Sequence, residues 1–362
     1  MKRLIPLILL ALTACSPGNN KTMDASKTQL MNRLSALAEN GRIAYGHQDD
    51  LVYGHAWQVT DWENDSLDRS DVKDVCGKYP ALAGFDLGGI ELGDAKNLDS
   101  VSFGLIRKAA LTHLRRGGMV TFSWHPRNPL TGGDAWDVSS NQVVKSILPG
   151  GEKEAEFALW LRRIADFFES LGPDAAVIFR PWHENLGSWF WWGGRLCTAE
   201  EYKALYRMTR TYFEEERGLR NLVWCYSPSG NFTEEAYMER YPGDDAVDLL
   251  GVDVYDNPEG NDREAVRARF LTEMKVSLDC LTALGALRGK PVCLSETGLE
   301  GIPDPTWWTE TLYPAVKDYP ICYLLTWRNA CDRPGHFFGP WAGVAGAEDF
   351  KAFSELEQIE ML

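Results

Sequence analysis

Short apolar runs alternate with amphipathic helical stretches along most of this chain of 362 residues. The apolar runs are rich in β-branched residues and end in polar or aromatic side chains, which is typical of buried strands. Eight such runs cover residues 43–46, 81–86, 119–124, 176–180, 222–226, 249–254, 292–295 and 322–327. Helical patterns between them include residues 102–116, 152–171, 198–216 and 263–284. This alternation predicts repeated βα units and a parallel sheet.

Eight parallel strands with helical crossovers predict an α/β fold that consists of a single (β/α)8 TIM barrel. No Ser/Gly-rich linker, internal repeat or low-complexity segment divides residues 41–362, which we assign to one catalytic barrel. Such a barrel carries its chemistry on the loops that follow the carboxyl ends of its strands. Polar side chains at those ends are therefore the candidates for function.

The amino terminus has the pattern of a bacterial lipoprotein. Residues 1–14 combine two basic residues with a short apolar stretch, as a signal peptide does. Residues 12–15 form a lipid-attachment box, so we expect cleavage before Cys15 and lipidation of that residue. Residues 15–40 are then a lipid-anchored leader and an N-terminal helix. Residues 16–20 contain no acidic side chain, which favours a periplasm-facing location in the cell envelope.

Charge and composition narrow the class of partner. The formal net charge is −15, and loss of Lys2 and Arg3 with the signal peptide would take it to −17. An acidic chain disfavours nucleic acids and polyanionic glycans but does not repel a neutral polysaccharide. Aromatic residues make up 12% of the chain and include 14 tryptophans, whose indoles can stack on sugar rings. We expect a monomer that acts on a neutral glycan.

The cysteines indicate packing and not metal binding. If Cys15 carries lipid, seven of the eight cysteines remain, scattered without a C-x-x-C pair, so at least one thiol is free. Cys225, Cys293 and Cys322 lie inside apolar strand-like runs, where a thiol behaves as a small hydrophobic group. The disulfide pairing of the others stays open.

Two glutamates follow buried strands that are far apart in the sequence. Glu184 follows the fourth strand and precedes an aromatic run at residues 189–192, and Glu296 follows the seventh strand. Cleavage of a glycosidic bond needs one carboxyl group to protonate the departing oxygen and a second to attack the sugar carbon. We predict that Glu184 is the general acid/base and Glu296 the nucleophile, about 5–5.5 Å apart as retention of configuration requires.

Each of these assignments has a structural alternative. Glu184 would only stabilise the fold if it paired with Arg180, and Glu296 would only cap the next helix. The apolar surroundings of Glu184 favour the protonated form that an acid catalyst needs. Gly298, two residues after Glu296, would permit a tight turn beside a substrate.

Other polar side chains at strand ends are candidates for substrate binding. Tyr255 ends the sixth strand next to Glu296, where its hydroxyl either orients the nucleophile or only lines the groove. His125 and His183 are expected to recognise sugar hydroxyls. A zinc site is disfavoured because Gly187 occupies the second histidine position of an H-E-x-x-H motif. We expect neither a metal nor a cofactor.

Aromatic and cationic residues complete the predicted binding site. Trp189 and the pair Trp327-Arg328 are expected to supply a stacking floor and a polar clamp for the sugar ring that is cleaved. Core packing is the alternative for Trp327.

Four segments of the chain resemble glycoside hydrolase family 26. They are R-P-W-H-E-N-L-G-S-W-F-W-W-G around Glu184, S-E-T-G around Glu296, Y-G-H-Q at residues 45–48 and T-W-R at residues 326–328. The resemblance spans the whole mature chain. It implies a (β/α)8 barrel that cleaves β-1,4-mannan with retention. The family residues that shape the central subsites correspond to His125, His183, Tyr255, Trp327 and Arg328.

The resemblance leaves the substrate and the mode of cleavage open. The same fold and mechanism would serve β-1,3-xylan or mixed-linkage β-glucan. A lipid-anchored glycan-binding protein without catalysis is the alternative from another class, and the presence of both carboxylates counts against it. The loops at residues 91–100 and 127–143 are long enough to block distal subsites. Internal cleavage and release of mannobiose from a chain end therefore both remain.

Overall fold

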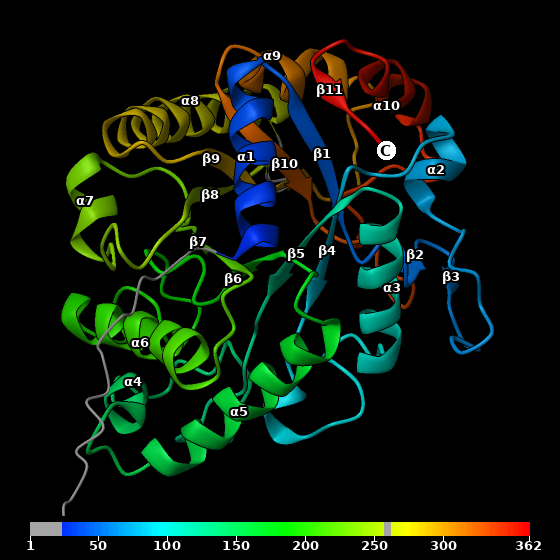
Figure 1. The fold of residues 1–362 in the computed structure, drawn as a ribbon. Helices are drawn as coiled ribbons and strands as arrows, with labels where there is room; N and C mark the ends of the chain where they lie inside the picture. The colour runs from blue at the N-terminus through cyan, green and yellow to red at the C-terminus, as the bar shows by residue number, and fades with distance from the viewer. Residues whose placement is uncertain (1–23, 257–261) are drawn as a thin grey trace, which may run out of the picture.

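Eight parallel strands form a closed barrel, which confirms the predicted (β/α)8 fold (Figure 1). The computed structural model describes residues 24–256 and 262–362. The barrel strands are β1 (Ile43–Gln48), β4 (Leu82–Asp86), β5 (Met119–Ser123), β6 (Val177–Arg180), β7 (Leu222–Tyr226), β8 (Leu249–Asp256), β9 (Val292–Leu299) and β10 (Ile321–Thr326). Each strand pairs in parallel with the next along the chain, and β10 pairs with β1 to close the barrel.

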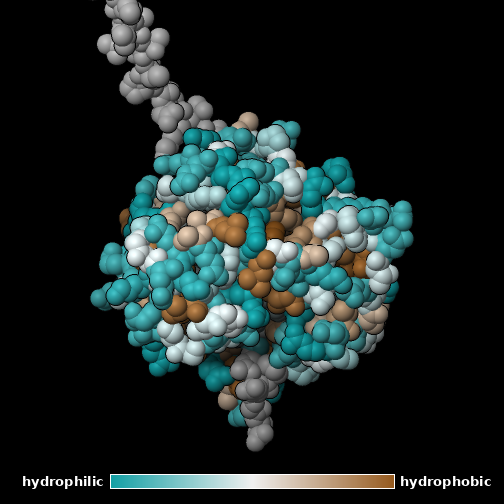
Figure 2. Space-filling view, turned by 90° about the horizontal axis from the view of Figure 1, so that it is seen from below, coloured by the Kyte–Doolittle hydropathy of each residue, from teal (hydrophilic) through white to brown (hydrophobic). Residues whose placement is uncertain are grey.

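Helices surround the barrel. They are α2 (Asp71–Cys76), α3 (Phe103–Arg115), α4 (Val143–Ile147), α5 (Glu154–Leu171), α6 (Ala199–Thr211), α7 (Glu234–Glu239), α8 (Arg263–Arg288), α9 (Tyr313–Val316) and α10 (Ala347–Ser354), with shorter helical turns η1 (Ile90–Leu92), η2 (Tyr212–Glu216) and η3 (Trp308–Leu312). Sequence signals set their ends: Thr198 and Glu201 form a capping box at α6, and Gly289 ends α8 in a left-handed conformation. The outer surface seen in Figure 2 is mostly hydrophilic, as amphipathic helices over a barrel require.

The N-terminal helix α1 (Ala25–Glu39) packs against the amino-terminal ends of the barrel strands. Leu30, Leu34 and Leu37 are buried in one cluster with interior residues of the strands, among them Cys293 and Cys322. Figure 1 shows α1 lying across β1 and β10, which it contacts. The helix closes this end of the barrel, so the opposite, carboxyl-terminal end is left for a functional site.

The cysteines of the described residues are all free. Cys225, Cys293 and Cys322 are fully buried inside the barrel, in agreement with a packing role. Four others, Cys76, Cys197, Cys280 and Cys331, also form no disulfide among the described residues. Cys15 and the predicted signal peptide lie outside the described residues.

Several elements differ from the sequence prediction. The hairpin β2 (Tyr53–Gly54) and β3 (Trp57–Gln58) and the strand β11 (Ile359–Glu360), which pairs with β1, have two residues each. Two residues are too few to show the alternation of apolar and polar positions by which a strand is predicted. Strands β8 and β9 also extend beyond residues 254 and 295, because their pairing continues to Asp256 and Leu299.

The extension of β9 corrects the expectation of a tight turn at Gly298. This residue lies within the strand, with φ of 152°, and a Cβ atom there would approach the Phe338 ring to 2.7 Å. Close approach of Phe338, and not a turn, is therefore the reason for glycine at this position.

Within the described residues, no helix has both the length and the apolar character needed to cross a bilayer.

Candidate active site

A pocket of about 650 Å³ opens at the carboxyl ends of the strands. Its lining includes seven of the eight predicted site residues, namely His125, His183, Glu184, Trp189, Tyr255, Glu296 and Trp327. The eighth, Arg328, lines an adjoining pocket of about 390 Å³. The two pockets share His125, Trp136, Trp327 and His336. The structure therefore brings all eight residues to one continuous depression.

Glu184 lies in the loop after β6, in a backbone conformation that few residues adopt. Its φ is 54°, and that of Trp182 is 57°. Hydrogen bonds hold this loop: the Glu184 N–H donates to the Ser227 carbonyl (2.8 Å), and the Trp192 indole donates to the His183 carbonyl (2.8 Å). Left-handed backbone at a bulky residue costs free energy and persists where surrounding contacts impose it, often at functional sites.

The Glu184 carboxyl group is half-buried and points into the pocket. The Trp189 indole N–H donates a hydrogen bond to its Oε2 at 2.5 Å. Burial, and then the nearby Glu296, raise the pKa of Glu184 to about 7. A carboxyl group with this pKa can hold a proton near neutrality and also release it, as a general acid/base does.

Glu296 is directed into the pocket by a β-bulge. The pairing of β8 with β9 shifts between Val252↔Leu294 and Asp253↔Glu296, so Ser295 is an extra residue in β9. With strict alternation after Cys293, which faces the interior, Ser295 would point inward and Glu296 outward. The bulge brings both side chains to the inner side.

Both oxygens of Glu296 accept hydrogen bonds. The Tyr255 hydroxyl donates to Oε2 at 2.6 Å, and the Arg180 guanidinium donates to Oε1. Tyr255 thus lies where it can orient this carboxylate. The predicted pairing of a glutamate with Arg180 also exists, but the partner is Glu296 and not Glu184.

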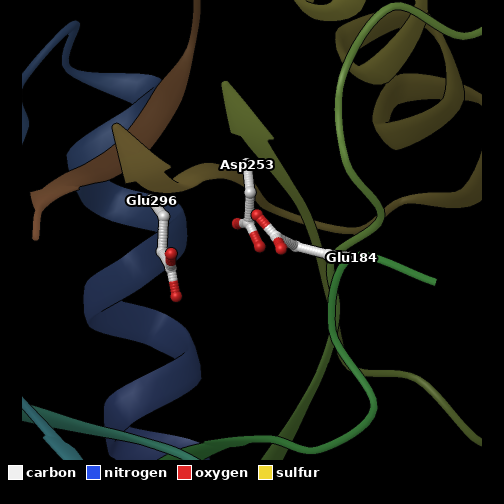
Figure 3. A group of neighbouring side chains, drawn as sticks. All are labelled: Glu184, Asp253 and Glu296. Atoms are coloured by element: carbon white, nitrogen blue, oxygen red, sulfur yellow. The ribbon is translucent and has the colours of Figure 1, made fainter. Parts of the chain in front are cut away.

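A third carboxylate, Asp253, lies beside the two glutamates (Figure 3). One oxygen from each of Glu184, Asp253 and Glu296 lies within 4.8 Å of the others. This spacing is consistent with the separation of about 5–5.5 Å between carboxyl groups in retaining glycosidases, and it is shorter than the roughly 6.5–9.5 Å of inverting ones. The arrangement therefore has room for one anomeric carbon but not for an additional water between carboxylate and sugar.

Arg180 connects two of these carboxylates. Its Nη1 donates to Asp253 Oδ2 at 3.0 Å, its Nη2 donates to Glu296, and the guanidinium is almost fully buried. The Ser295 hydroxyl donates to Asp253 Oδ1 at 2.6 Å. Burial, together with the nearby Glu296 and Glu184, leaves the pKa of Asp253 raised, while the bonds from Arg180 and Ser295 act in the opposite direction and favour its ionised form.

Sequence reasoning did not identify Asp253 or give Arg180 a role in the site. The signal was present, because each is a charged residue at an inward position of an otherwise apolar strand. Arg180 lies two residues after Ile178, and Asp253 two residues before Tyr255.

The three carboxylates are, among the described residues, the one group of such ligands close enough together to hold a metal ion. Arg180 already bonds two of them, and its fixed positive charge opposes a cation at the same position. The donor set is thus better suited to sharing a proton than to binding a metal.

The two predicted histidines form a chain with a second buried aspartate. His125 Nδ1 lies 2.7 Å from Asp86 Oδ2, and the Nε2 atoms of His125 and His183 are 3.0 Å apart. Burial disfavours the imidazolium of His125, but Asp86 outweighs it and leaves the pKa raised. Burial, together with Arg180 and His125, lowers the pKa of His183. The pair therefore carries at most one positive charge, held on His125.

Exposed indoles border the pocket. Trp189 is 44% exposed and Trp136 is 48% exposed, and Trp136 stacks on His125 with 5.3 Å between ring centroids. Exposed aromatic faces beside polar groups are typical of sugar-binding sites. Trp136 belongs to the loop at residues 127–143, and the sequence analysis did not single it out.

Arg328 has partners of its own. Its guanidinium forms an ion pair with Asp99 (2.9 Å) and donates to the Tyr53 hydroxyl (3.2 Å), and both charged side chains are buried. It lies in the wall of the adjoining pocket, beside Trp327.

Comparison with known proteins agrees with this geometry. The sequence model described as "Glycosyl hydrolase family 26" matches residues 19–290. The structure of a β-mannanase of this family from Bacteroides ovatus is 44% identical, with a TM-score of 0.86 over 93% of this chain and 94% of that one. A mannan endo-1,4-β-mannosidase from Bacillus subtilis is 30% identical over 89% of this chain and 87% of its own length.

A larger relative shows the same similarity. A mannan endo-1,4-β-mannosidase from Bifidobacterium adolescentis is 32% identical over 94% of this chain, which spans only 36% of that protein.

The raised pKa of Glu184 predicts a pH-dependent cost to stability. The folded protein keeps the proton to about pH 7, whereas the unfolded chain releases it near its ordinary pKa of 4.5. Ionisation of Glu184 therefore destabilises the fold increasingly between these values and fully above pH 7. We expect Glu184→Gln to be more stable than wild type by about 1–3 kcal/mol at pH 8, and this gain to shrink at pH 5.

Thermal denaturation at both pH values measures this difference. Glu273→Gln, in α8 on the outer wall of the same pocket, is the matched control and should show wild-type pH dependence. Equal melting temperatures for Glu184→Gln and wild type at pH 8 would contradict the prediction.

Proposed function

The chain belongs to glycosyl hydrolase family 26, and we propose that it is a retaining hydrolase of β-1,4-mannosidic bonds. The observation that carries this proposal is the placement of Glu184 and Glu296 across one pocket. One oxygen of each lies within 4.8 Å of the other, and of the two glutamates only Glu296 is bonded to Arg180. One carboxyl group can thus donate a proton while the other stays ionised and attacks.

The first step joins the sugar to the enzyme. A Glu296 oxygen attacks the anomeric carbon as the bond from that carbon to the glycosidic oxygen breaks, and the Glu184 proton passes to the departing oxygen. The product of this step is a glycosyl ester of Glu296. The Tyr255 hydroxyl, 2.6 Å from Oε2, keeps the carboxylate in place for the attack.

The second step releases the sugar. Glu184, now ionised, removes a proton from a water molecule that attacks the same carbon, and the ester bond to Glu296 breaks. Two displacements on one carbon restore the original configuration. His125, His183, Trp189, Trp327 and Arg328 line the depression and bind the sugars on either side of the bond.

Replacement of the nucleophile tests the chemistry. We expect Glu296→Gln to reduce the release of reducing sugar from β-1,4-mannan by about 10⁴-fold or more, because no covalent intermediate can form. Glu348→Gln, on the exposed start of α10, should retain wild-type activity. Parallel assays on β-1,3-xylan and mixed-linkage β-glucan test the substrate.

Three outcomes would contradict the proposal. Faster cleavage of xylan or glucan than of mannan would change the assigned substrate. Undiminished turnover by a folded Glu296→Gln variant would reject the nucleophile. Binding of manno-oligosaccharides by wild type without any hydrolysis would leave a glycan-binding protein.

We infer that cleavage yields mainly short products, with mannobiose dominant, because the adjoining pocket has a rigid wall. Asp99 and Arg328 form a buried ion pair there, and Leu98 lies beside them. The Asn97 side chain donates to the Asp86 carbonyl (3.1 Å) and accepts from the Val101 N–H (3.0 Å), which fixes this loop. Glu184 and Trp189 do not line this pocket, so we assign it to sugars on the retained side of the bond.

A time course on mannohexaose tests this assignment. Mannobiose should dominate from the earliest time points, and Asp99→Ala, which removes the partner of Arg328, should broaden the range of early products. Mixed product lengths from wild type at early times would instead indicate internal attack along an open groove.

We also propose that the protein is anchored to the cell envelope through lipid on Cys15, with the barrel facing the periplasm. The lipid-attachment box at residues 12–15 supports this location. In a bacterial host, the wild-type chain should be found in the membrane fraction, and Cys15→Ser should move it to the soluble fraction. A fully soluble wild-type protein would contradict the anchor.

A further inference from the structure

Asp253 occupies the centre of the site without lining the pocket. Its side chain is fully buried, and the residue is absent from the lining of both pockets described above. Figure 3 shows its carboxylate close to that of Glu184, with Glu296 on the neighbouring strand. A group that does not reach the substrate can act only through its neighbours.

The neighbours of Asp253 are the groups that perform the chemistry. It is the register partner of Glu296 across the bulge between β8 and β9. Its Oδ2 accepts from Arg180 Nη1 at 3.0 Å, and the other nitrogen of the same guanidinium donates to Glu296. Because the guanidinium is planar and rigid, fixing one nitrogen on Asp253 also fixes the direction of the bond to Glu296.

We propose that Asp253 is a positioning residue for this reaction: its buried negative charge holds Arg180 against Glu296 and keeps the proton on Glu184. The inference rests on the proposed function, since it assigns Asp253 a part in the same two-step hydrolysis.

The charges around Glu184 support this role. The titratable and charged groups around it include Arg180 from β6, Asp253 and Tyr255 from β8, Glu296 from β9, and His125 and His183 from the loops after β5 and β6. The same pocket is also lined by Asp256, by Arg269 and Glu273 of α8, and by Glu300 and His336. His125 is balanced by Asp86. Of the three clustered carboxyl groups, Glu184 alone has no bond to Arg180, so a single shared proton belongs on Glu184.

This charge balance changes during the reaction. In the free enzyme, Arg180 bonds both Asp253 and Glu296 and so favours their ionised forms. Their two negative charges exceed its single positive charge, which favours a protonated Glu184. Once Glu296 becomes a neutral ester, the negative charge of Asp253 and the positive charge of Arg180 cancel. Glu184 can then ionise and act as the base. Without the charge of Asp253, Glu184 would lose its proton too early, in the free enzyme.

Loss of the negative charge at position 253 should affect a substrate that needs a proton for its leaving group more than one that does not. Formation of the intermediate from an oligosaccharide needs a proton for the departing sugar, whereas 2,4-dinitrophenolate departs without one. A neutral residue at position 253 should therefore impair cleavage of mannotetraose more than cleavage of 2,4-dinitrophenyl β-mannobioside. A purely structural defect would impair both substrates equally.

The experiment compares kcat/KM as a function of pH for both substrates in wild type, Asp253→Asn and Asp253→Ser. Both variants are neutral, so either one that folds, as judged by circular dichroism, decides the question. For mannotetraose, we expect the basic limb of the kcat/KM profile of the Asp253 variants to move to lower pH by about one to two units. At pH 7 the loss on mannotetraose should exceed that on the dinitrophenyl substrate by about tenfold or more.

Ser227→Ala is the matched control, because Ser227 is a neutral partner of the same guanidinium, 3.2 Å from Nη1. Its basic limb should stay at the wild-type position. An unmoved basic limb in the Asp253 variants, or equal losses on both substrates, would overturn the inference. Failure of the proposed function would appear differently, as a wild-type enzyme that hydrolyses neither substrate.

Discussion

The buried guanidinium of Arg180 is the constraint on which the site depends. It is 2% exposed and bonds two carboxylates on neighbouring strands, Asp253 and Glu296. A buried charge is tolerated only when partners compensate it, and removal of one partner leaves an uncompensated charge in the interior. Because Arg180 bonds two carboxylates and Glu184 is not one of them, three carboxyl groups of similar intrinsic acidity are separated into different roles.

The barrel makes this arrangement possible by placing distant segments at one end of the sheet. Strands β6, β8 and β9 deliver Arg180, Asp253 and Glu296 at similar heights, although more than a hundred residues separate the first from the last. Two local irregularities complete the geometry. A bulge turns Glu296 inward, and a left-handed backbone at Glu184 directs its carboxyl group toward the other two. Both departures from regular geometry occur at reacting groups, where structural strain is commonly found.

The sequence predicted the fold well because its signals are local. Runs such as residues 222–226 are apolar throughout, and the capping residues around α6 lie within a few positions of the helix end. Glu184, Glu296 and Tyr255 could be placed together because parallel strands share one functional rim. The bulge at Ser295 could not be predicted, because it depends on pairing with β8. A regular strand would have pointed Glu296 away from the pocket.

The carboxylate partners of Arg180 could likewise not be predicted from the sequence, because the guanidinium reaches across the barrel to strands that are distant along the chain. Trapping the covalent intermediate with 2-deoxy-2-fluoro-β-mannobiosyl fluoride, and mapping the labelled peptide by mass spectrometry, would identify the nucleophile. Although three carboxylates lie within 4.8 Å of one another, we expect a single ester, on Glu296. An ester on Asp253 or Glu184 would contradict the division of roles that Arg180 imposes.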